Sequence, residues 1–324
     1  MSRSRMILAF LAIYLIWGST YYAIRVAVES IPPLAMMATR CLAAGLVLYA
    51  WSRRSAPAPD ARAWRAAFVA GAFLFLLSHG SLAWAEQRVA SGEAALLGAT
   101  TPLWLTLVDW RWGSGRMPGG YGRAGLLLGF AGVALLFAPE WRGAGSGLAV
   151  ANAAIVGAAI AWAVGSVYGR RARLPRDVRQ STAVQLLAGA VWLAAASAAT
   201  GEWRTFAFAS VTRPSVAALA YLIVFGSVIA FTAYIWLLRV TTASRVGTHA
   251  YVNPIVAVAL GAVLGGEQVS VLTVVSALTI VAGVILVLVD QSRPAPADAT
   301  RAGEAAVMPP DAQPQASTPH FTSA

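Results

Sequence analysis

Arg40 is the residue whose type and setting most directly predict chemistry. It lies about seven residues inside the apolar run 33–51, which places it roughly 10 Å deep in a helix that rises about 1.5 Å per residue. An arginine in a membrane-spanning helix costs about 2.5–3.5 kcal/mol to insert, so its guanidinium must face protein or water. It could bind the carboxylate of a small molecule through two parallel hydrogen bonds. The alternative is that it bonds to helix carbonyls and fixes the packing.

Two prolines lie near the middle of apolar runs, each beside a polar residue, in Thr101-Pro102 and Asn253-Pro254. Each proline removes one backbone hydrogen bond and predicts a kink, whose free carbonyl a ligand, a water molecule or a neighbouring side chain can satisfy. The alternative is that the kinks only shape the helices.

The two histidines inside apolar runs are His79 and His249. Both can titrate near neutral pH and so could move a proton, or they could simply hydrogen-bond one helix to another. Aromatic side chains could line a cavity for flat, amphipathic molecules, although they also populate membrane interfaces and helix contacts. The aromatic candidates are Trp17, Trp84, Trp162, Tyr234, Trp236 and Tyr251. Together, the residues that we expect to contact a small-molecule substrate are Trp17, Arg40, His79, Thr101, Pro102, Tyr251, Asn253 and Pro254.

The acidic residues and the missing lysines limit the possible chemistry. The acidic residues near the runs fall at helix ends or in loops, so the sequence predicts no carboxylate proton carrier; they are Glu29, Glu86, Glu93, Asp109, Glu140 and Glu267. All 24 basic residues are arginine, which excludes a Walker-type phosphate loop and a Schiff-base lysine in this chain. No metal-ligand cluster, nucleophile elbow or close carboxylate pair is evident, and we expect no catalytic residue, metal or cofactor. Cys41 is the single cysteine and is expected to pack as a small hydrophobe.

The elements that must position these residues are membrane-spanning helices. Of 324 residues, 58% are hydrophobic and 11% charged, whereas a soluble domain carries about 25% charged residues. A span needs about 20 apolar residues, which predicts an all-α integral membrane protein with ten transmembrane helices at 6–28, 33–51, 66–85, 92–110, 124–138, 147–168, 181–199, 215–238, 246–264 and 269–289. The polar, Pro/Ala-rich stretch 291–324 is predicted to be a disordered tail.

The distribution of arginine predicts the orientation. With the N-terminus in the cytoplasm, eighteen arginines fall in inside segments, four in outside loops, and Arg25 and Arg40 within spans. Cytoplasmic loops are enriched in basic residues, so both termini are expected inside. The net charge of +11 is therefore explained by loops beside anionic head groups and not by nucleic-acid binding.

The two halves of the chain repeat. A shift of 152 residues places Thr101-Pro102 on Asn253-Pro254 and Trp84 on Trp236. We expect a first repeat over 1–138 and a second over 147–289. An odd number of helices per repeat inverts the second copy, and inverted repeats can exchange inward-open and outward-open states around a central site.

Several short motifs resemble the bacterial EamA-type transporters of the drug/metabolite transporter superfamily, and their YedA-like exporters in particular. They are Ile16-Trp17-Gly18-Ser19-Thr20-Tyr21 with Arg25, Pro32-Pro33 with Arg40, and Tyr251-Val252-Asn253-Pro254 with Gly265-Gly266-Glu267. The resemblance covers residues 6–289 and implies two five-helix EamA repeats, an inner-membrane location, and export of metabolites or drugs through a central cavity. In one departure, Gly113-Ser114-Gly115 replaces the acidic motif in the first half.

A secondary transporter, with a small-molecule substrate and the lipid bilayer as its partners, is therefore the expected function. The alternatives are an intramembrane enzyme acting on lipid, for which the motifs above are missing, and a membrane sensor or assembly partner, for which the loops are short.

Overall fold

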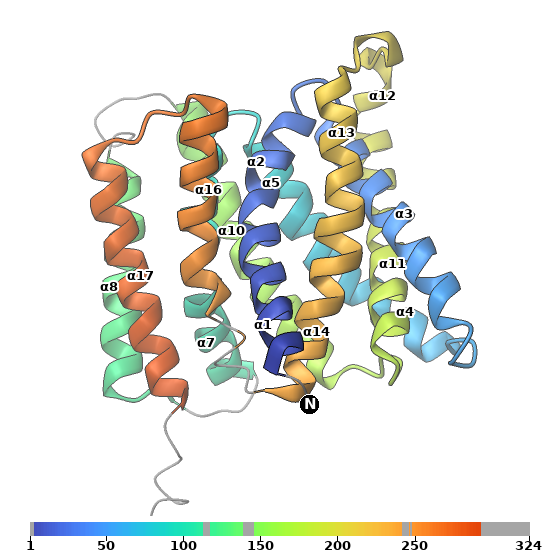
Figure 1. Ribbon diagram of the computed structural model, residues 1–324, viewed down its shortest axis with the longest axis horizontal. Helices are drawn as coiled ribbons and strands as arrows, with labels where there is room; N and C mark the ends of the chain where they lie inside the picture. Colours follow the sequence, from blue (N-terminus) through green and yellow to red (C-terminus); the bar gives the residue numbers. More distant parts are fainter. Residues whose placement is uncertain (1–2, 113–116, 139–145, 242–245, 247, 293–324) are drawn as a thin grey trace, which may run out of the picture. The chain divides into compact units, whose positions relative to one another are not determined.

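The computed structural model describes residues 3–112, 117–138, 146–241, 246 and 248–292, and every regular element within these ranges is a helix (Figure 1). Seven helical runs among the described residues are long and apolar enough to cross a membrane: Arg3–Ala27, Pro33–Ser52, Ala61–Ala85, Gly147–Arg171, Val178–Ala199, Arg213–Tyr234 and Val271–Ser292. Two further apolar helices are shorter, α8 (Gly120–Leu136) and α16 (His249–Gly265). The predicted all-helical membrane class is thus confirmed.

Three of the long runs contain a π-helical segment, a wider turn that often occurs at functional sites. The first run consists of α1 (Arg3–Leu11), η1 (Ala12–Ile16) and α2 (Trp17–Ala27). The second π-helical run consists of α4 (Ala61–Gly71), η2 (Ala72–Gly80) and α5 (Ser81–Ala85). The third consists of α13 (Arg213–Tyr221), η4 (Leu222–Ala230) and α14 (Phe231–Val240). The segments η2 and η4 occupy equivalent places in the two halves of the chain.

One helical run is interrupted between α6 (Ser91–Gly98) and α7 (Thr101–Trp112). The break immediately precedes Pro102, which has no N–H to continue the helix. The hydroxyl of Thr100 donates to the Leu97 carbonyl at 2.6 Å and that of Thr101 to the Gly98 carbonyl at 2.7 Å. The kink that the sequence predicts at Pro102 is therefore a full interruption, whereas α16 continues through Pro254.

The remaining helices complete a bundle with two distinct ends. They are α3 (Pro33–Ser52), α10 (Ser146–Arg171), α11 (Val178–Ala199), α12 (Glu202–Thr205), the short 3₁₀ helix η3 (Phe208–Ser210) and α17 (Val271–Ser292). We call the end with Arg54, Arg62, Arg111 and Arg171 the arginine-rich end, and the opposite end the α12 end (Figure 1). The helix α17 reaches Ser292, two residues into the predicted tail, and the rest of that tail lies outside the described residues.

Carboxylates cap two helices at the arginine-rich end. Asp60 accepts the N–H of Ala63 at 2.7 Å at the start of α4, and Asp177 accepts that of Gln180 at 3.0 Å at the start of α11. Partial burial raises the pKa of Asp177, but the hydrogen bonds from Gln180 and Arg179 outweigh it and leave the pKa below its usual value. Both helices therefore begin where a side chain satisfies a free N–H group.

At the start of three other helices, a carboxylate from a distant part of the chain accepts the first N–H groups. Glu202 accepts the N–H groups of Leu34 and Ala35 at 3.1 and 2.9 Å, at the start of α3. Glu267 accepts those of Ser91 and Gly92 at 2.8 and 3.1 Å, at the start of α6. Asp290 accepts that of Gly119 at 2.8 Å, at the start of α8. The first N–H groups of a helix have no partner within it, so these carboxylates stabilise helix starts and join distant segments.

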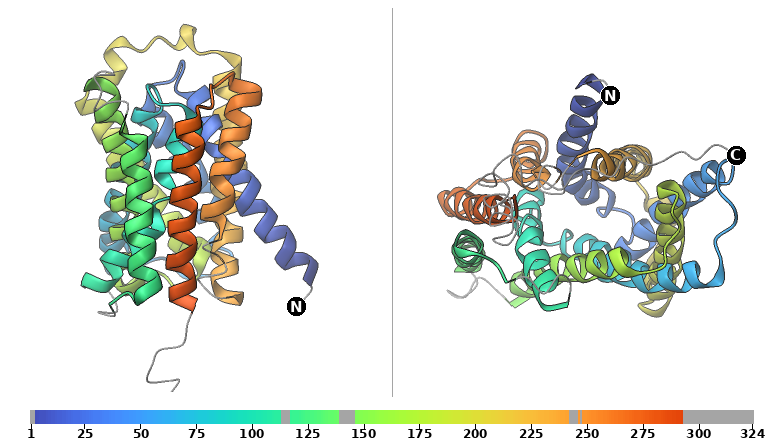
Figure 2. Two further views of the ribbon diagram at one scale, coloured as in Figure 1. Left: turned by 90° about the vertical axis from the view of Figure 1, so that its left-hand side faces the viewer. Right: turned by 90° about the horizontal axis from the view of Figure 1, so that it is seen from below.

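Glycines allow the second-half helices to approach their partners closely. Figure 2 shows α8 and α17 side by side, and a Cβ placed on Gly125 would lie 2.5 Å from the carbonyl oxygen of Gly283. A Cβ on Gly18 would lie 2.6 Å from Val256, where α2 packs on α16. Small residues permit such close helix packing in membranes.

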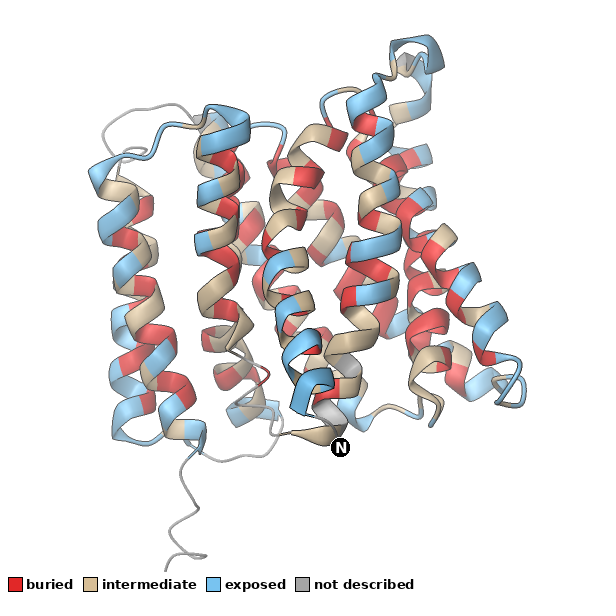
Figure 3. Ribbon diagram, in the orientation of Figure 1, coloured by how far each residue is buried: buried red, intermediate tan, exposed pale blue. Residues whose placement is uncertain are grey.

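Apolar side chains cover the outside of the bundle as well as its inside. Buried residues lie on the helix faces turned toward other helices, and exposed ones on the opposite faces (Figure 3). Among the strongly exposed side chains are those of Leu127, Val263, Val271 and Leu278. A large exposed apolar surface of this kind fits a lipid environment.

We expect Glu202→Gln to lower the stability of the purified protein by about 1–3 kcal/mol, because a charged acceptor of two helix N–H groups becomes a neutral amide. Thermal unfolding in detergent measures the change. Glu29→Gln is the matched control, since Glu29 is an exposed carboxylate at the same end, and it should unfold like wild type. Equal stability of the two variants would contradict the assignment.

Candidate functional site

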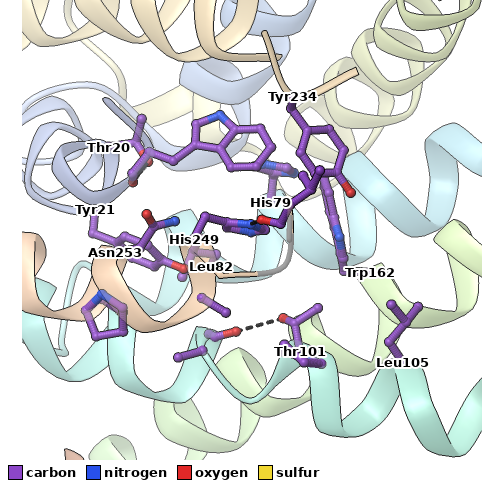
Figure 4. A pocket seen from close by; sticks show the side chains of 18 of the residues that line it. Thr20, Tyr21, His79, Leu82, Thr101, Leu105, Trp162, Tyr234, His249 and Asn253 are labelled. Atoms are coloured by element: carbon purple, nitrogen blue, oxygen red, sulfur yellow. Dashed lines mark hydrogen bonds between the residues drawn. The ribbon is translucent and has the colours of Figure 1, made fainter. Parts of the chain in front are cut away.

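A cavity of 370 Å³ lies between helices from both halves of the chain. Its lining from the first half comes from α2, α3, η2, α5, α6 and α7, and from the second half it comes from α10, α14, α16 and α17. Figure 4 shows His79, Trp162, Tyr234, His249 and Asn253 around this space.

Seven of the eight residues that the sequence predicts to contact substrate line this cavity: Trp17, Arg40, His79, Thr101, Pro102, Asn253 and Pro254. Tyr251 does not line it and packs instead against the apolar cluster that includes Ala250 and Val284. Successive helix residues are about 100° apart, so Tyr251 and Asn253, two positions apart on α16, point in nearly opposite directions.

Arg40 is buried and lines the cavity. Its Nε donates to the hydroxyl of Ser227 at 2.8 Å, and Nη1 lies 3.9 Å from the sulfur of Met37. Among the described residues, Arg40 forms no ion pair. Burying an ion costs several kcal/mol that a partner charge would normally offset, so the guanidinium can accept an anionic group in the cavity.

Aromatic rings surround the guanidinium side of the cavity. The ring of Trp17 lies 4.9 Å from that of Tyr234 and 5.2 Å from that of His249. Trp17 is fixed by its indole N–H, which donates to the Gly226 carbonyl at 3.2 Å. Since η4 supplies both Gly226 and Ser227, this π-helical segment orients Trp17 and Arg40 together.

The two histidines each have one ring nitrogen engaged. Nδ1 of His79 lies 2.7 Å from the Leu74 carbonyl, and Nδ1 of His249 lies 2.8 Å from that of Val246. A carbonyl is only an acceptor, so each Nδ1 carries the proton in the neutral ring and Nε2 is the acceptor. The His79 ring also stacks on Phe75 and meets the edge of Trp162, with centroids 5.5 and 5.3 Å apart. Both rings are thus oriented acceptors at the cavity wall.

Asn253 joins α16 to the first helical run. With its amide nitrogen directed at them, it donates to the carbonyls of Tyr14, Ile13 and His249 at 3.1, 3.3 and 3.1 Å. The carbonyls of Ile13 and Tyr14 belong to η1. The amide nitrogen of Asn253 therefore binds backbone carbonyls beside the cavity and links two helical runs.

The cavity opens toward the arginine-rich end. There its lining includes Asp109 and Arg170, an ion pair of 2.5 Å whose side chains are 30% and 58% exposed. Gln291 also lines this end and donates to the hydroxyl of Thr106 at 2.8 Å. Toward the α12 end, the lining stops at Tyr21, Ile24 and Leu82.

Two links join distant segments at the α12 end. Glu267 holds the start of α6, as described above, and Gly266 makes this possible. Gly266 ends α16 with a φ of 62°, a left-handed conformation that favours glycine, and the N–H of Glu267 then donates to the Gly261 carbonyl at 2.9 Å. In the second link, Arg25 Nη1 donates to the carbonyls of Glu86 and Val89.

Some lining residues escape the sequence prediction. Tyr21 and Thr20 belong to the quoted first motif and could have been chosen as one face with Trp17, by their spacing of three and four residues. Asp109, Arg170 and Gln291 carry no such signal, because they meet only through the packing of α7, α10 and α17. Within the described ranges, no group of His, Cys, Asp and Glu residues could hold a metal ion.

Comparisons with known proteins identify relatives of this chain. The model of the EamA-like transporter family matches twice, over residues 4–138 and 149–289. The uncharacterized inner membrane transporter YedA of Escherichia coli (strain K12) is 39% identical over 86% of this chain and 89% of its own length. The uncharacterized transporter YvbV of Bacillus subtilis (strain 168) is 26% identical over 88% and 92%. A crystal structure that is 24% identical superposes with a TM-score of 0.61 over 88% of this chain and 96% of that one, which supports the same fold.

We expect Asn253→Ala to lower stability by about 1–3 kcal/mol, because backbone carbonyls in a buried setting lose a donor. Asn253→Asp should destabilise the protein more at neutral pH, because it directs a carboxylate at the same three carbonyls. Thermal unfolding in detergent distinguishes the two variants. Wild-type stability of Asn253→Asp would show that the amide oxygen, and not the nitrogen, faces η1.

Proposed function

Because the chain belongs to the EamA-like transporter family, we propose that it is a secondary transporter of the inner membrane that exports small metabolites or drugs. The proposal includes ten transmembrane helices in two inverted five-helix repeats, over 1–138 and 147–289, and a disordered tail. It is supported by the double match of the family model and by the seven long and two shorter apolar helices, with α6 and α7 together as one further crossing.

Alternating access around the cavity is the proposed mechanism. The lining comes from both halves of the chain, so relative motion of two inverted repeats would open one end while closing the other. The present arrangement, open at the arginine-rich end, corresponds to one of these two states.

We place the arginine-rich end and both termini in the cytoplasm. The support is the excess of arginine in the segments at that end, since cytoplasmic loops carry the basic residues. The described state would then face the cytoplasm, the side from which an exporter loads its solute.

The choice of substrate class rests on the position of Arg40. This residue is a buried cation without an ion-pair partner among the described residues, and it lines a cavity with aromatic walls. A planar or otherwise apolar molecule with a carboxylate would satisfy both features: the carboxylate by charge-assisted hydrogen bonds and the apolar part by contact with Trp17 and Tyr234. The substrate class is therefore small amphipathic organic anions.

Arg40→Gln should weaken the binding of aromatic carboxylates by roughly 10- to 100-fold, as expected for the loss of about 1.5–3 kcal/mol of charge-assisted bonding. Arg40→Lys should retain part of the affinity, because the charge remains without the planar fork. The measurement is the ligand-induced rise in melting temperature of purified protein, with indole-3-acetate and benzoate compared against indole-3-acetamide and benzamide.

The matched control is Arg88→Gln. Arg88 is an exposed arginine stacked over Trp84 and outside the cavity lining, so its loss should leave the preference for carboxylates unchanged. If wild-type protein binds the amides as tightly as the acids, the assignment of Arg40 to an anionic group is wrong. Flux of the tightest-binding acid in proteoliposomes then tests transport itself.

The proposed orientation predicts which single cysteines react from outside. In a Cys41→Ala background, Ala207→Cys at the α12 end should react with an impermeant maleimide added to intact spheroplasts. Ser55→Cys at the arginine-rich end should react only after permeabilisation. Both positions are exposed, so access to the two aqueous sides decides the result, and the reverse pattern would overturn the orientation.

A further inference from the structure

Glu86 is a buried carboxylate that the cavity does not use. It follows the last residue of α5, and its side chain has 0% exposure. Neither carboxylate oxygen has a hydrogen-bond partner among the described residues. The sequence placed Glu86 at a helix end, which the structure confirms, but the structure also buries its side chain.

The surroundings of Glu86 favour its neutral form. An ionised carboxylate buried without hydrogen bonds is far more costly than a neutral polar group. Arg25 is the cation that contacts this turn and could pair with the carboxylate. Its guanidinium instead donates to the backbone carbonyls of Glu86 and Val89. In the described state, Glu86 is therefore the protonated acid.

Other groups around α5 do not compensate the carboxylate either. Glu267 is engaged with the N–H groups of α6, and Glu93 accepts from Asn152 at 2.7 Å. The elements packed around Glu86 carry further titratable and charged groups: Tyr21, Tyr22 and Arg25 on α2, Arg40, Cys41 and Tyr49 on α3, His79 on η2, Arg88 in the following turn, Glu93 on α6, Tyr168, Arg170 and Arg171 at the far end of α10, and Glu267 after α16.

Glu86 also lies between two spaces on opposite sides of the closed end. Leu82, one turn earlier, lines the cavity, whereas Gln87, the next residue, lines a depression at the α12 end. On α2, Ile24 lines the cavity and Val28 lines the same depression. The layer that contains Glu86 and Arg25 thus separates the cavity from the outer surface.

We propose that Glu86 is a proton-binding site whose O–H bond forms and breaks as access alternates. When the α12 end opens, water reaches the carboxyl, which loses its proton to that side and leaves a carboxylate beside the Arg25 guanidinium. When the end closes again, the carboxylate takes up one proton from the water at the same end and is buried as the acid. This inference rests on the proposed transport function and couples one proton to each change of access.

The protonation state can be tested on the intact purified protein without a solute. A hydrophobic carbodiimide, dicyclohexylcarbodiimide, modifies protonated carboxyls in apolar surroundings, and mass spectrometry should find its adduct on Glu86 and not on Glu267. The adduct should decrease as pH rises and disappear in Glu86→Gln. An equal adduct from a water-soluble carbodiimide, or no adduct at any pH, would overturn the proposal.

The link to access is tested with a cysteine in the cavity. In the Cys41→Ala background, Leu82→Cys should react with an impermeant maleimide added at the α12 end, to an extent that rises with pH by up to about tenfold per unit, because one proton is released. Rates are normalised to Ala207→Cys, which corrects for ionisation of the thiol. The added change Glu86→Gln should make the normalised rate independent of pH, whereas Glu29→Gln, an exposed acid at the same end, should leave the rise in place.

The outcomes separate this proposal from the proposed function. If the normalised labelling rate still rises with pH in the Glu86→Gln variant, Glu86 is not the proton-binding site. That result would not affect the Arg40 binding test. Conversely, failure of aromatic carboxylates to bind leaves the carbodiimide and cysteine results interpretable, because neither requires a substrate.

Discussion

A helix that starts inside a membrane protein has N–H groups with no partner in the helix itself, and this bundle depends on how those groups are satisfied. Carboxylates from distant segments do so at the starts of α3, α6 and α8. Each contact performs two tasks, because it stabilises a helix start and fixes the position of one segment against another. The close approach of Gly18 to Val256 and of Gly125 to Gly283 then places the helices between these points. The cavity is the space that remains inside this framework.

Two π-helical segments position polar and aromatic side chains at the cavity. η2 carries His79, and η4 carries the Gly226 carbonyl and the Ser227 hydroxyl that orient Trp17 and Arg40. A π turn has an i→i+5 bond and changes which residues face inward. The two segments occupy equivalent places in the two halves but act differently, since η2 lines the cavity with His79 whereas η4 orients Trp17 and Arg40 from behind the lining.

The sequence predicted most of the fold because long apolar runs leave few alternatives to membrane helices. It predicted seven of the cavity residues because Arg40, His79 and the two prolines are unusual inside such runs. Tyr251 belongs to the same motif as Asn253 but does not line the cavity, because helix periodicity and not motif membership decides the direction of a side chain. Glu86 was missed for a different reason. Its position at a helix end suggested exposure, but the segments that cover it, α2 and the turn at Glu267, come from distant parts of the sequence.

The contact between Glu267 and α6 also affects the relative populations of the two access states of the proposed cycle. In the proposed transport cycle, the two charge-assisted bonds of Glu267 favour the state with a closed α12 end, whatever the cavity contains. A difference of about 1.4 kcal/mol changes the ratio of two states tenfold. In the first half, the equivalent motif Gly113-Ser114-Gly115 contains no acidic residue, so the contact that Glu267 makes has no counterpart there in the sequence. In the proposed cycle, a solute arriving at the arginine-rich end meets a site that is already open, and its binding energy is not reduced by a cost of opening. The affinity measured from the two sides should therefore differ even though the residues that touch the solute are the same.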